Sequence, residues 1–169
     1  MTQRPKVIVD PHFRAMGDVF APADLQRLGE AVDVVWGRDE PMSDDAFRAA
    51  LPDAFAVVSA GWRYGRVLDV AENLRAILTV SGGWPPELDY GQCFARGIRV
   101  LSAAPAFAGA VAEMALGLAL ACSRDVVGGD RAVRSGEERW LSAGEGLGTF
   151  TLYGKRVGFV GFGNIGRAL

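Results

Sequence analysis

Short apolar segments alternate with amphipathic segments over the N-terminal part of the chain. Five segments are rich in Val, Ile, Leu and Ala, and we expect each to be a β-strand: residues 6–10, 33–36, 55–60, 75–81 and 97–102. Their apolar positions are continuous rather than alternating, which is typical of parallel strands that are buried on both faces.

The segments between these strands predict helices, because their apolar residues recur every three or four positions or because a serine and two aspartates form a capped first turn. We expect these helices at residues 22–32, 43–51, 66–73 and 87–95. The alternation of strand and helix predicts an α/β fold, with a flavodoxin-like domain of five parallel strands over residues 1–102.

A long apolar helix is predicted over residues 107–125, with Glu113 near its N-terminus. A helix that is apolar nearly all round must be covered on several sides, so we expect it to cross between two domains. Its uncharged run after Glu113 spans ten residues, whereas a bilayer requires about 20. We therefore expect no membrane span and a soluble, cytoplasmic protein.

Composition narrows the possible functions of the 169 residues. The net charge of −2 provides no basic surface for nucleic acid. The single histidine and two separated cysteines, Cys93 and Cys122, do not have the spacing of a metal site or a disulfide framework. The N-terminus lacks the apolar core of a secretory signal. We expect no nucleic-acid partner and no bound metal.

A glycine motif closes the sequence. Residues 156–160 are predicted to form a strand that runs directly into Gly161, Gly163 and Gly166, which fit G-x-G-x-x-G. In dinucleotide-binding folds these glycines form a tight turn, let the backbone approach a pyrophosphate and pack a helix against the strand. The acid that usually holds the ribose would follow about 20 residues later, past Leu169, so a plain glycine-rich turn is the alternative.

Several ordered motifs together resemble the D-isomer-specific 2-hydroxyacid dehydrogenases. They are Leu74-Arg75-Ala76-Ile77, Ser81-Gly82-Gly83, Gly97-Ile98-Arg99-Val100, Val111-Ala112-Glu113 and the terminal Gly161-Phe162-Gly163-Asn164-Ile165-Gly166. The resemblance implies a substrate domain over residues 1–102, a crossover helix over 103–125 and the incomplete start of a Rossmann domain over 126–169. It also implies NAD or NADP as cofactor, a small 2-hydroxy or 2-keto acid as substrate, and a homodimer.

The same resemblance assigns two binding sites. The backbone amides of Ser81, Gly82 and Gly83 would bind the substrate carboxylate, although this segment can also be read as a plain turn. The cofactor pyrophosphate would be held by residues of the glycine motif, namely Gly161, Gly163, Asn164, Ile165 and Gly166.

The sequence also departs from the family pattern. Gly83 is followed by Trp84-Pro85-Pro86, which makes this loop one residue longer, and Ala103-Ala104-Pro105 replaces the usual Asn-x-Pro. Phe107-Ala108 replaces the Asn/Thr pair expected before Val-Ala-Glu.

No catalytic residue is assigned within the chain, because the family's arginine, acid and histidine all follow the glycine motif. His12 and Asp10 are interpreted as loop residues, while Arg63 could reach a carboxylate.

Three functional interpretations remain at this level. The chain can be the N-terminal part of a dehydrogenase whose catalytic residues lie beyond Leu169, so that the 169 residues alone are inactive. It can instead be a non-enzymatic remnant that self-associates or binds a small carboxylate. A stand-alone flavodoxin-like domain is the third. We further expect residues 126–169 to be loosely packed or stabilised by a second copy, because a βαβ unit needs about 30 residues or more.

Overall fold

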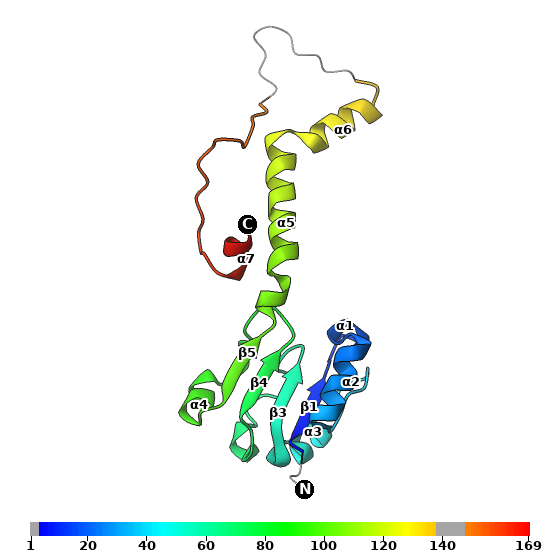
Figure 1. Ribbon diagram of the computed structural model, residues 1–169, viewed down its shortest axis with the longest axis vertical. Coiled ribbons are helices and arrows are strands. Elements are labelled where there is room, and N and C mark those ends of the chain that lie inside the picture. The colour runs from blue at the N-terminus through cyan, green and yellow to red at the C-terminus, as the bar shows by residue number, and fades with distance from the viewer. Residues whose placement is uncertain (1–3, 138–147) are drawn as a thin grey trace. The chain divides into compact units, whose positions relative to one another are not determined.

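Within residues 4–137 and 148–169, which the computed structural model describes, five parallel strands form one sheet in the order β2-β1-β3-β4-β5 (Figure 1). The strands are β1 (Lys6–Asp10), β2 (Asp33–Val34), β3 (Ala54–Ser59), β4 (Ala76–Thr79) and β5 (Arg99–Ser102). This order is the flavodoxin-like one, in which the connection reverses direction between β1 and β3. The predicted α/β class and parallel sheet are confirmed.

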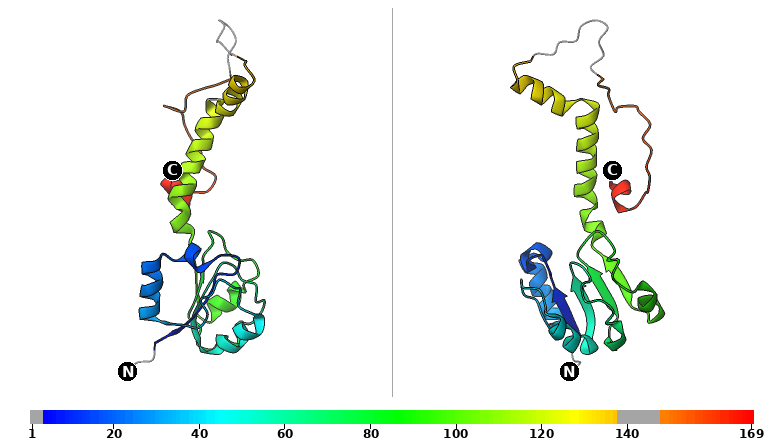
Figure 2. Two further views of the ribbon diagram at one scale, coloured as in Figure 1. Left: turned by 90° about the vertical axis from the view of Figure 1, so that its right-hand side faces the viewer. Right: turned by 180° about the vertical axis from the view of Figure 1, so that it is seen from behind.

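Short helices cover the two faces of this sheet. Helices α1 (Met16–Val19) and α2 (Pro22–Ala31) lie on one face, and α3 (Asp44–Ala50) and α4 (Tyr90–Ala95) lie on the other, as Figure 2 shows. Two 3₁₀ turns, η1 (Leu51–Asp53) and η2 (Leu68–Val70), complete this unit. The chain divides into two units by its contacts, Met1–Ala104 and Pro105–Leu169.

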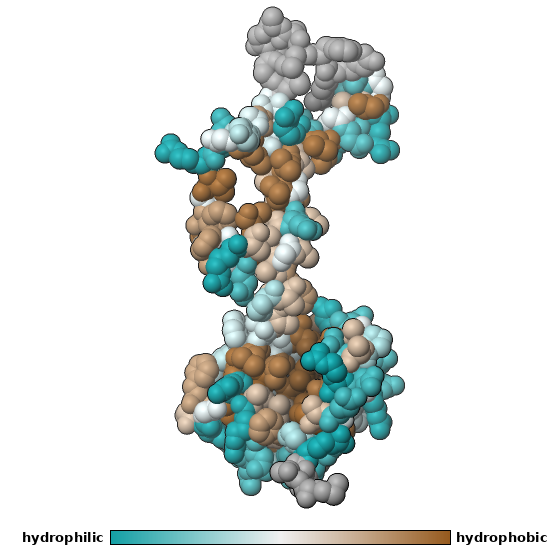
Figure 3. Space-filling view, viewed as in Figure 1, coloured by the Kyte–Doolittle hydropathy of each residue, from teal (hydrophilic) through white to brown (hydrophobic). Residues whose placement is uncertain are grey.

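The larger of two apolar layers lies between the sheet and α3 and α4. Ile8, Val57 and Ile77 from three neighbouring strands are fully or almost fully buried there against Phe47 and Leu51. The second layer, beneath α1 and α2, is smaller. On the sheet face that carries α1 and α2, no helix in the described part of the unit covers the side chains of β4 and β5. Leu101 of β5 is accordingly 48% exposed. Figure 3 shows apolar surface over these strands.

Helix caps explain where two of the predicted helices begin. The Ser43 hydroxyl accepts a hydrogen bond from the Ala46 N–H at 3.3 Å, which fixes the start of α3 as the sequence predicted. The Asp89 carboxylate accepts from the Gln92 N–H at 2.9 Å. Helix α4 therefore begins at Tyr90, after the cap, rather than at residue 87.

The helix predicted over residues 66–73 is wrong, because only the short turn η2 forms there. The carbonyl groups of Leu68 and Ala71 accept hydrogen bonds from the Arg96 guanidinium. A side chain from another part of the sequence thus provides the hydrogen-bond donors for these carbonyls. They do not require the backbone N–H groups that an α-helix would supply.

The second unit begins with α5 (Ala104–Ser123) and continues with α6 (Val126–Arg134) and α7 (Asn164–Ala168). Helix α5 starts at Ala104 rather than at residue 107, and most of its apolar side chains are exposed, including Met114 and Leu118. By length and composition α5 could cross a membrane, with a mean hydropathy of 1.7. Core helices of soluble proteins meet the same criterion, so this finding is weak evidence.

The strand predicted over residues 156–160 is also wrong. These residues are described, but they belong to no strand, and Val157 and Val160 are exposed. A strand needs a neighbour that accepts and donates its backbone hydrogen bonds, and none of the described segments provides one here. Residues 138–147 of the predicted Rossmann start lie outside the described residues. The loose packing expected for residues 126–169 stays a prediction.

Candidate functional site

A solvent-open hollow of about 290 Å³ lies at the carboxyl ends of β3 and β4, and we call it the β3–β4 hollow. Residues 60–62 after β3 line one side, and Ser81 with residues 83–87 after β4 line the other. In open parallel sheets, ligands bind outside the carboxyl ends of the strands. The location therefore makes this hollow the leading candidate site.

The predicted carboxylate-binding segment, residues 81–83, contributes Ser81 and Gly83 to this lining. The hydroxyls of Thr79 and Ser81 both donate to the Gly83 carbonyl oxygen, at 3.3 and 3.4 Å. None of the backbone N–H groups of residues 81–83 donates to an acceptor within the described residues. The loop is thus held through its carbonyl and hydroxyl groups, while its amides remain available to an anion.

Two tryptophans form contrasting walls of the hollow. Trp62 is 3% exposed, and its indole N–H donates to the Gly65 carbonyl at 2.9 Å. Trp84 is 57% exposed and lies edge-on to Tyr90, with ring centroids 6.4 Å apart. The Tyr90 hydroxyl donates to the Pro85 carbonyl at 2.7 Å, which ties the loop of Trp84 to α4.

The carboxylate of Asp10 organises the neighbouring strand ends. It is fully buried, and its Oδ1 accepts from the N–H groups of His12 at 3.2 Å and Met42 at 3.1 Å. Its Oδ2 lies 3.2 Å from the Arg63 guanidinium and accepts from the Tyr64 hydroxyl. One carboxylate therefore links the loop after β1, the segment before α3 and the loop after β3.

Arg63 and Tyr64 are both committed to this cluster. Arg63 forms a second ion pair with Asp44 at 3.2 Å and donates to the Met42 carbonyl. Burial, followed by the hydrogen bond to Asp10, raises the pKa of Tyr64 far above its ordinary value, so the phenol stays a neutral donor. Its ring stacks on Phe47 with centroids 3.4 Å apart.

Sequence reasoning missed the role of Asp10, which it interpreted as a loop residue. The available signal was its position as the last residue of an apolar strand, where a side chain is buried and a charge requires partners. His12 lies in the loop after β1 with a φ of 59°, and its Nδ1 has no hydrogen-bond partner within the described residues. His12 is not among the residues that line the β3–β4 hollow.

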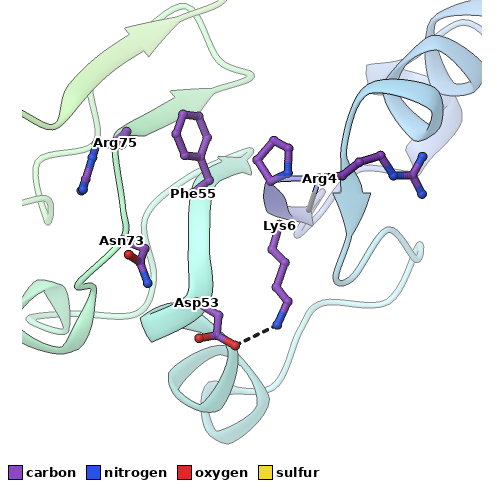
Figure 4. A pocket seen from close by; sticks show the side chains of 7 residues that line it. Arg4, Lys6, Asp53, Phe55, Asn73 and Arg75 are labelled. Carbon is purple, nitrogen blue, oxygen red and sulfur yellow. Dashed lines mark hydrogen bonds and ion pairs between the residues drawn. The ribbon is translucent and has the colours of Figure 1, made fainter. Parts of the chain in front are cut away.

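A second hollow, of about 360 Å³, lies at the opposite, amino edge of the sheet (Figure 4). Its basic residues are already engaged: Lys6 pairs with Asp53 at 2.8 Å, and Arg4 pairs with Asp33 at 2.8 Å. The guanidinium of Arg75, which also lines this hollow, donates to the carbonyl groups of Glu72 and Leu74. Because it lies at the amino ends of the strands, this hollow is a weaker candidate than the β3–β4 hollow.

The glycine motif forms a turn directly before helix α7 (Asn164–Ala168), although the residues that precede it belong to no strand. Gly161 has a φ of +88°, which favours glycine, and a Cβ at Gly166 would lie 3.3 Å from the Gly161 carbonyl oxygen. A Cβ at Gly163 would meet nothing within 4 Å. Helix α7 begins directly after Gly163 without a side-chain cap. Its free first-turn amides and the open space at Gly163 fit a dinucleotide pyrophosphate.

The described residues contain no cluster of three or more histidine, cysteine, aspartate or glutamate side chains suited to an ion.

Comparison with known families gives a match for most of the second unit. Residues 116–169 match the family model of the D-isomer specific 2-hydroxyacid dehydrogenase, NAD binding domain. Among curated proteins, the chain is 35% identical over 156 residues to D-3-phosphoglycerate dehydrogenase of Mycobacterium tuberculosis, covering 90% of this chain and 28% of that protein. It is 30% identical over 175 residues to glyoxylate reductase of Pyrococcus horikoshii, covering 98% and 49%.

Solved structures agree with this result. A phosphoglycerate oxidoreductase from Rhizobium etli matches with a TM-score of 0.74 and 31% identity, over 98% of this chain and 51% of that one. An NADPH-dependent glyoxylate/hydroxypyruvate reductase from Sinorhizobium meliloti, in complex with citrate, matches with a TM-score of 0.64 and 25% identity, over 99% and 49%. The chain thus spans about half, or less, of the length of these relatives.

Proposed function

We propose that the chain forms the substrate-binding unit and the start of the nucleotide-binding unit of an NAD(P)-dependent oxidoreductase. Its relation in sequence and in fold to the D-isomer specific 2-hydroxyacid dehydrogenases supports this proposal. The reaction is hydride transfer between the nicotinamide and C2 of a small 2-hydroxy or 2-keto acid. The cofactor supplies the hydride chemistry, and the residues of this chain bind and orient the two reactants.

The observation that carries this proposal is the set of free amides in the 81–83 loop, of which Ser81 and Gly83 line the β3–β4 hollow. The N–H groups of Ser81, Gly82 and Gly83 have no acceptor within the described residues, and a substrate carboxylate would supply one. Hydrogen bonds from backbone amides to an ionised acceptor are stronger than bonds between neutral groups. They would fix the carboxylate end of the substrate and so orient C2 for transfer.

The glycine motif would hold the cofactor. The turn at Gly161 and the open space at Gly163 leave room for a pyrophosphate, and at position 166 a Cβ would contact the Gly161 carbonyl oxygen closely, at 3.3 Å. The first-turn amides at Asn164 and Ile165 would donate to its oxygens.

Proton exchange with the substrate oxygen needs an acid or base. Following the resemblance to the family, we assign the catalytic histidine, its acid partner and the substrate-binding arginine to sequence beyond Leu169. The described residues that line the hollow include Glu87 but no histidine. A homodimer in the cytoplasm is part of the proposal, and the exposed apolar side chains of α5 support self-association.

The intact mass of the protein from its native source tests the proposal first. We expect a mass near twice the 18.0 kDa of these residues, together with NADH oxidation in the presence of glyoxylate or hydroxypyruvate. A native mass of 18.0 kDa without turnover would refute the dehydrogenase assignment. The non-enzymatic, carboxylate-binding alternative would then apply.

A further inference from the structure

The composition of the β3–β4 hollow bears on which 2-hydroxy acids it accepts. We infer that it favours substrates with a bulky apolar side chain, such as an aromatic 2-hydroxy or 2-keto acid, over phosphorylated ones, and that Trp84 determines this preference. The inference rests on the proposed function, since it assumes that residues 81–83 bind the carboxylate.

The charge of the lining argues against a phosphorylated substrate. The residues that line the hollow include no lysine or arginine within the described part of the chain, and Glu87 is their one ionisable side chain. The guanidinium of Arg63, whose neighbour Trp62 does line the hollow, is occupied by Asp10 and Asp44. A phosphate ester carries up to two negative charges, so Glu87 would repel it and no lining cation would compensate.

The shape of the lining favours an apolar group. Trp84, Pro85 and Pro86 stand directly after the amides that would hold the carboxylate, so a side chain on the substrate would meet them next. Trp84 offers a largely exposed ring face, and its loop is braced by the hydrogen bond from Tyr90 to Pro85. A fixed aromatic surface gains more from an apolar ligand than a mobile one, because less side-chain freedom is lost on binding.

A third hollow, which shares Trp84 with the β3–β4 hollow, extends the apolar surface. It measures about 320 Å³ and is lined by Trp84, Tyr90, Phe94 and Val100, none of which is charged. Trp84 belongs to both hollows, so the same ring borders the space next to the carboxylate site and a larger apolar space. A substrate with only one or two carbons beyond C2 would use neither surface fully.

Binding of three hydroxy acids to the protein as its native source makes it tests the inference. The probes are D-lactate, D-phenyllactate and D-3-phosphoglycerate, and the readouts are the NMR shifts of the amides of residues 81–83 and of the Trp84 indole N–H. We expect all ligands that bind to shift the amides, and D-phenyllactate to bind about tenfold more tightly than D-lactate, within the range that apolar pockets achieve. D-3-phosphoglycerate should bind more weakly than either.

Variants separate the role of Trp84 from a general loss of structure. Trp84→Ala should lower the affinity for D-phenyllactate much more than the affinity for D-lactate and so remove most of the preference, whereas Trp84→Phe should retain most of it. Phe55→Ala is the matched control, because Phe55 is an exposed aromatic residue in the hollow at the opposite edge of the sheet (Figure 4).

The outcomes distinguish this inference from the proposed function. If no probe shifts the amides of residues 81–83, both the carboxylate site and the preference are refuted. Equal affinities for D-lactate and D-phenyllactate, or tighter binding of D-3-phosphoglycerate, would overturn the preference alone and leave the carboxylate site standing.

Discussion

The carboxylate of Asp10 lies 3.2 Å from the guanidinium of Arg63, and this ion pair joins the carboxyl ends of β1 and β3. Asp10 is completely buried and Arg63 is only 25% exposed, so the pair is shielded from solvent. Arg63 directly follows Trp62, which lines the β3–β4 hollow. The ion pair therefore anchors the segment that carries one wall of the candidate site, although neither Asp10 nor Arg63 lines the hollow itself.

Removing this buried carboxylate should destabilise the first unit strongly. Asp10→Ala removes one of the two acidic partners of Arg63 and leaves the Tyr64 hydroxyl and two backbone N–H groups without this acceptor. We expect the free energy of unfolding to fall by about 3 kcal/mol or more. Asp53→Ala is the matched control: its pair with Lys6 is exposed, and the loss should be below about 1 kcal/mol. Urea denaturation followed by tryptophan fluorescence measures both, and equal losses would contradict the prediction.

Tyr64 should make stability depend on pH in the alkaline range. In the unfolded chain a tyrosine ionises near pH 10, whereas burial and the Asp10 hydrogen bond keep Tyr64 protonated in the folded state. The unfolded state therefore loses its proton first. The stabilisation that the protonated Tyr64 gives the folded state is therefore fully present below about pH 10. Above that pH, the free energy of unfolding falls by up to about 1.4 kcal/mol per pH unit.

Two variants test this slope. Tyr64→Phe should make the alkaline decline shallower and should cost about 1 kcal/mol at neutral pH through the lost hydrogen bond. Tyr153→Phe, at a position that is 93% exposed, should leave the slope unchanged. Urea titrations between pH 8 and 11 would count against the role of Tyr64 if both variants gave the wild-type slope.

The two cysteines should differ in reactivity. Burial raises the pKa of the Cys93 thiol, whose side chain lies within the core, whereas Cys122 is exposed on α5. We expect a thiol reagent at pH 8 to modify one thiol per chain quickly and the second only in urea. Cys122→Ser should remove the fast phase and Cys93→Ser should keep it. Two fast thiols, or none, would show that the core or the exposed face of α5 is organised differently.

The glycine motif gives a prediction for cofactor affinity in the protein as its native source makes it. Gly163→Ala places a methyl group in open space, so it should leave folding unchanged but weaken NADH binding about tenfold, equivalent to losing one charge-assisted hydrogen bond. Gly29→Ala in α2, where an added Cβ would also meet nothing within 4 Å, is the control for a glycine substitution outside the motif, and it should leave NADH binding unchanged. Fluorescence titration with NADH measures each affinity, and unchanged binding in Gly163→Ala would place the pyrophosphate elsewhere.

Local signals predicted much of the first unit. The strand at residues 6–10 matches β1 at both ends, and Ser43 caps α3 as expected. These features depend on a few adjacent residues: a β-branched run ended by Asp-Pro, and a hydroxyl placed before the first helical turn. The strand order and the position of the 81–83 loop then follow from the alternation of strands and helices.

Interactions between distant residues account for what the sequence did not reveal. Arg96 satisfies the carbonyls of Leu68 and Ala71, so a segment with apolar helical spacing forms only a short turn. Asp10 and Arg63 are 53 positions apart, and no local pattern shows that they pair. The strand predicted at residues 156–160 does not form because no described strand lies beside it. An apolar sequence of this kind forms a strand only when a neighbouring strand shares its backbone hydrogen bonds.

The cluster around Asp10 also affects how the site can be engineered. The loops after β1 and β3 and the segment before α3 all form hydrogen bonds with the Asp10 carboxylate. Replacing any one of these segments with its counterpart from a relative would disturb the hydrogen bonds of the other two. The 81–87 loop forms no contact with that carboxylate in the described hydrogen bonds and ion pairs. Substrate specificity can therefore be changed by replacing the loop of Trp84 alone. The other three segments have to be replaced together, because they share the Asp10 carboxylate.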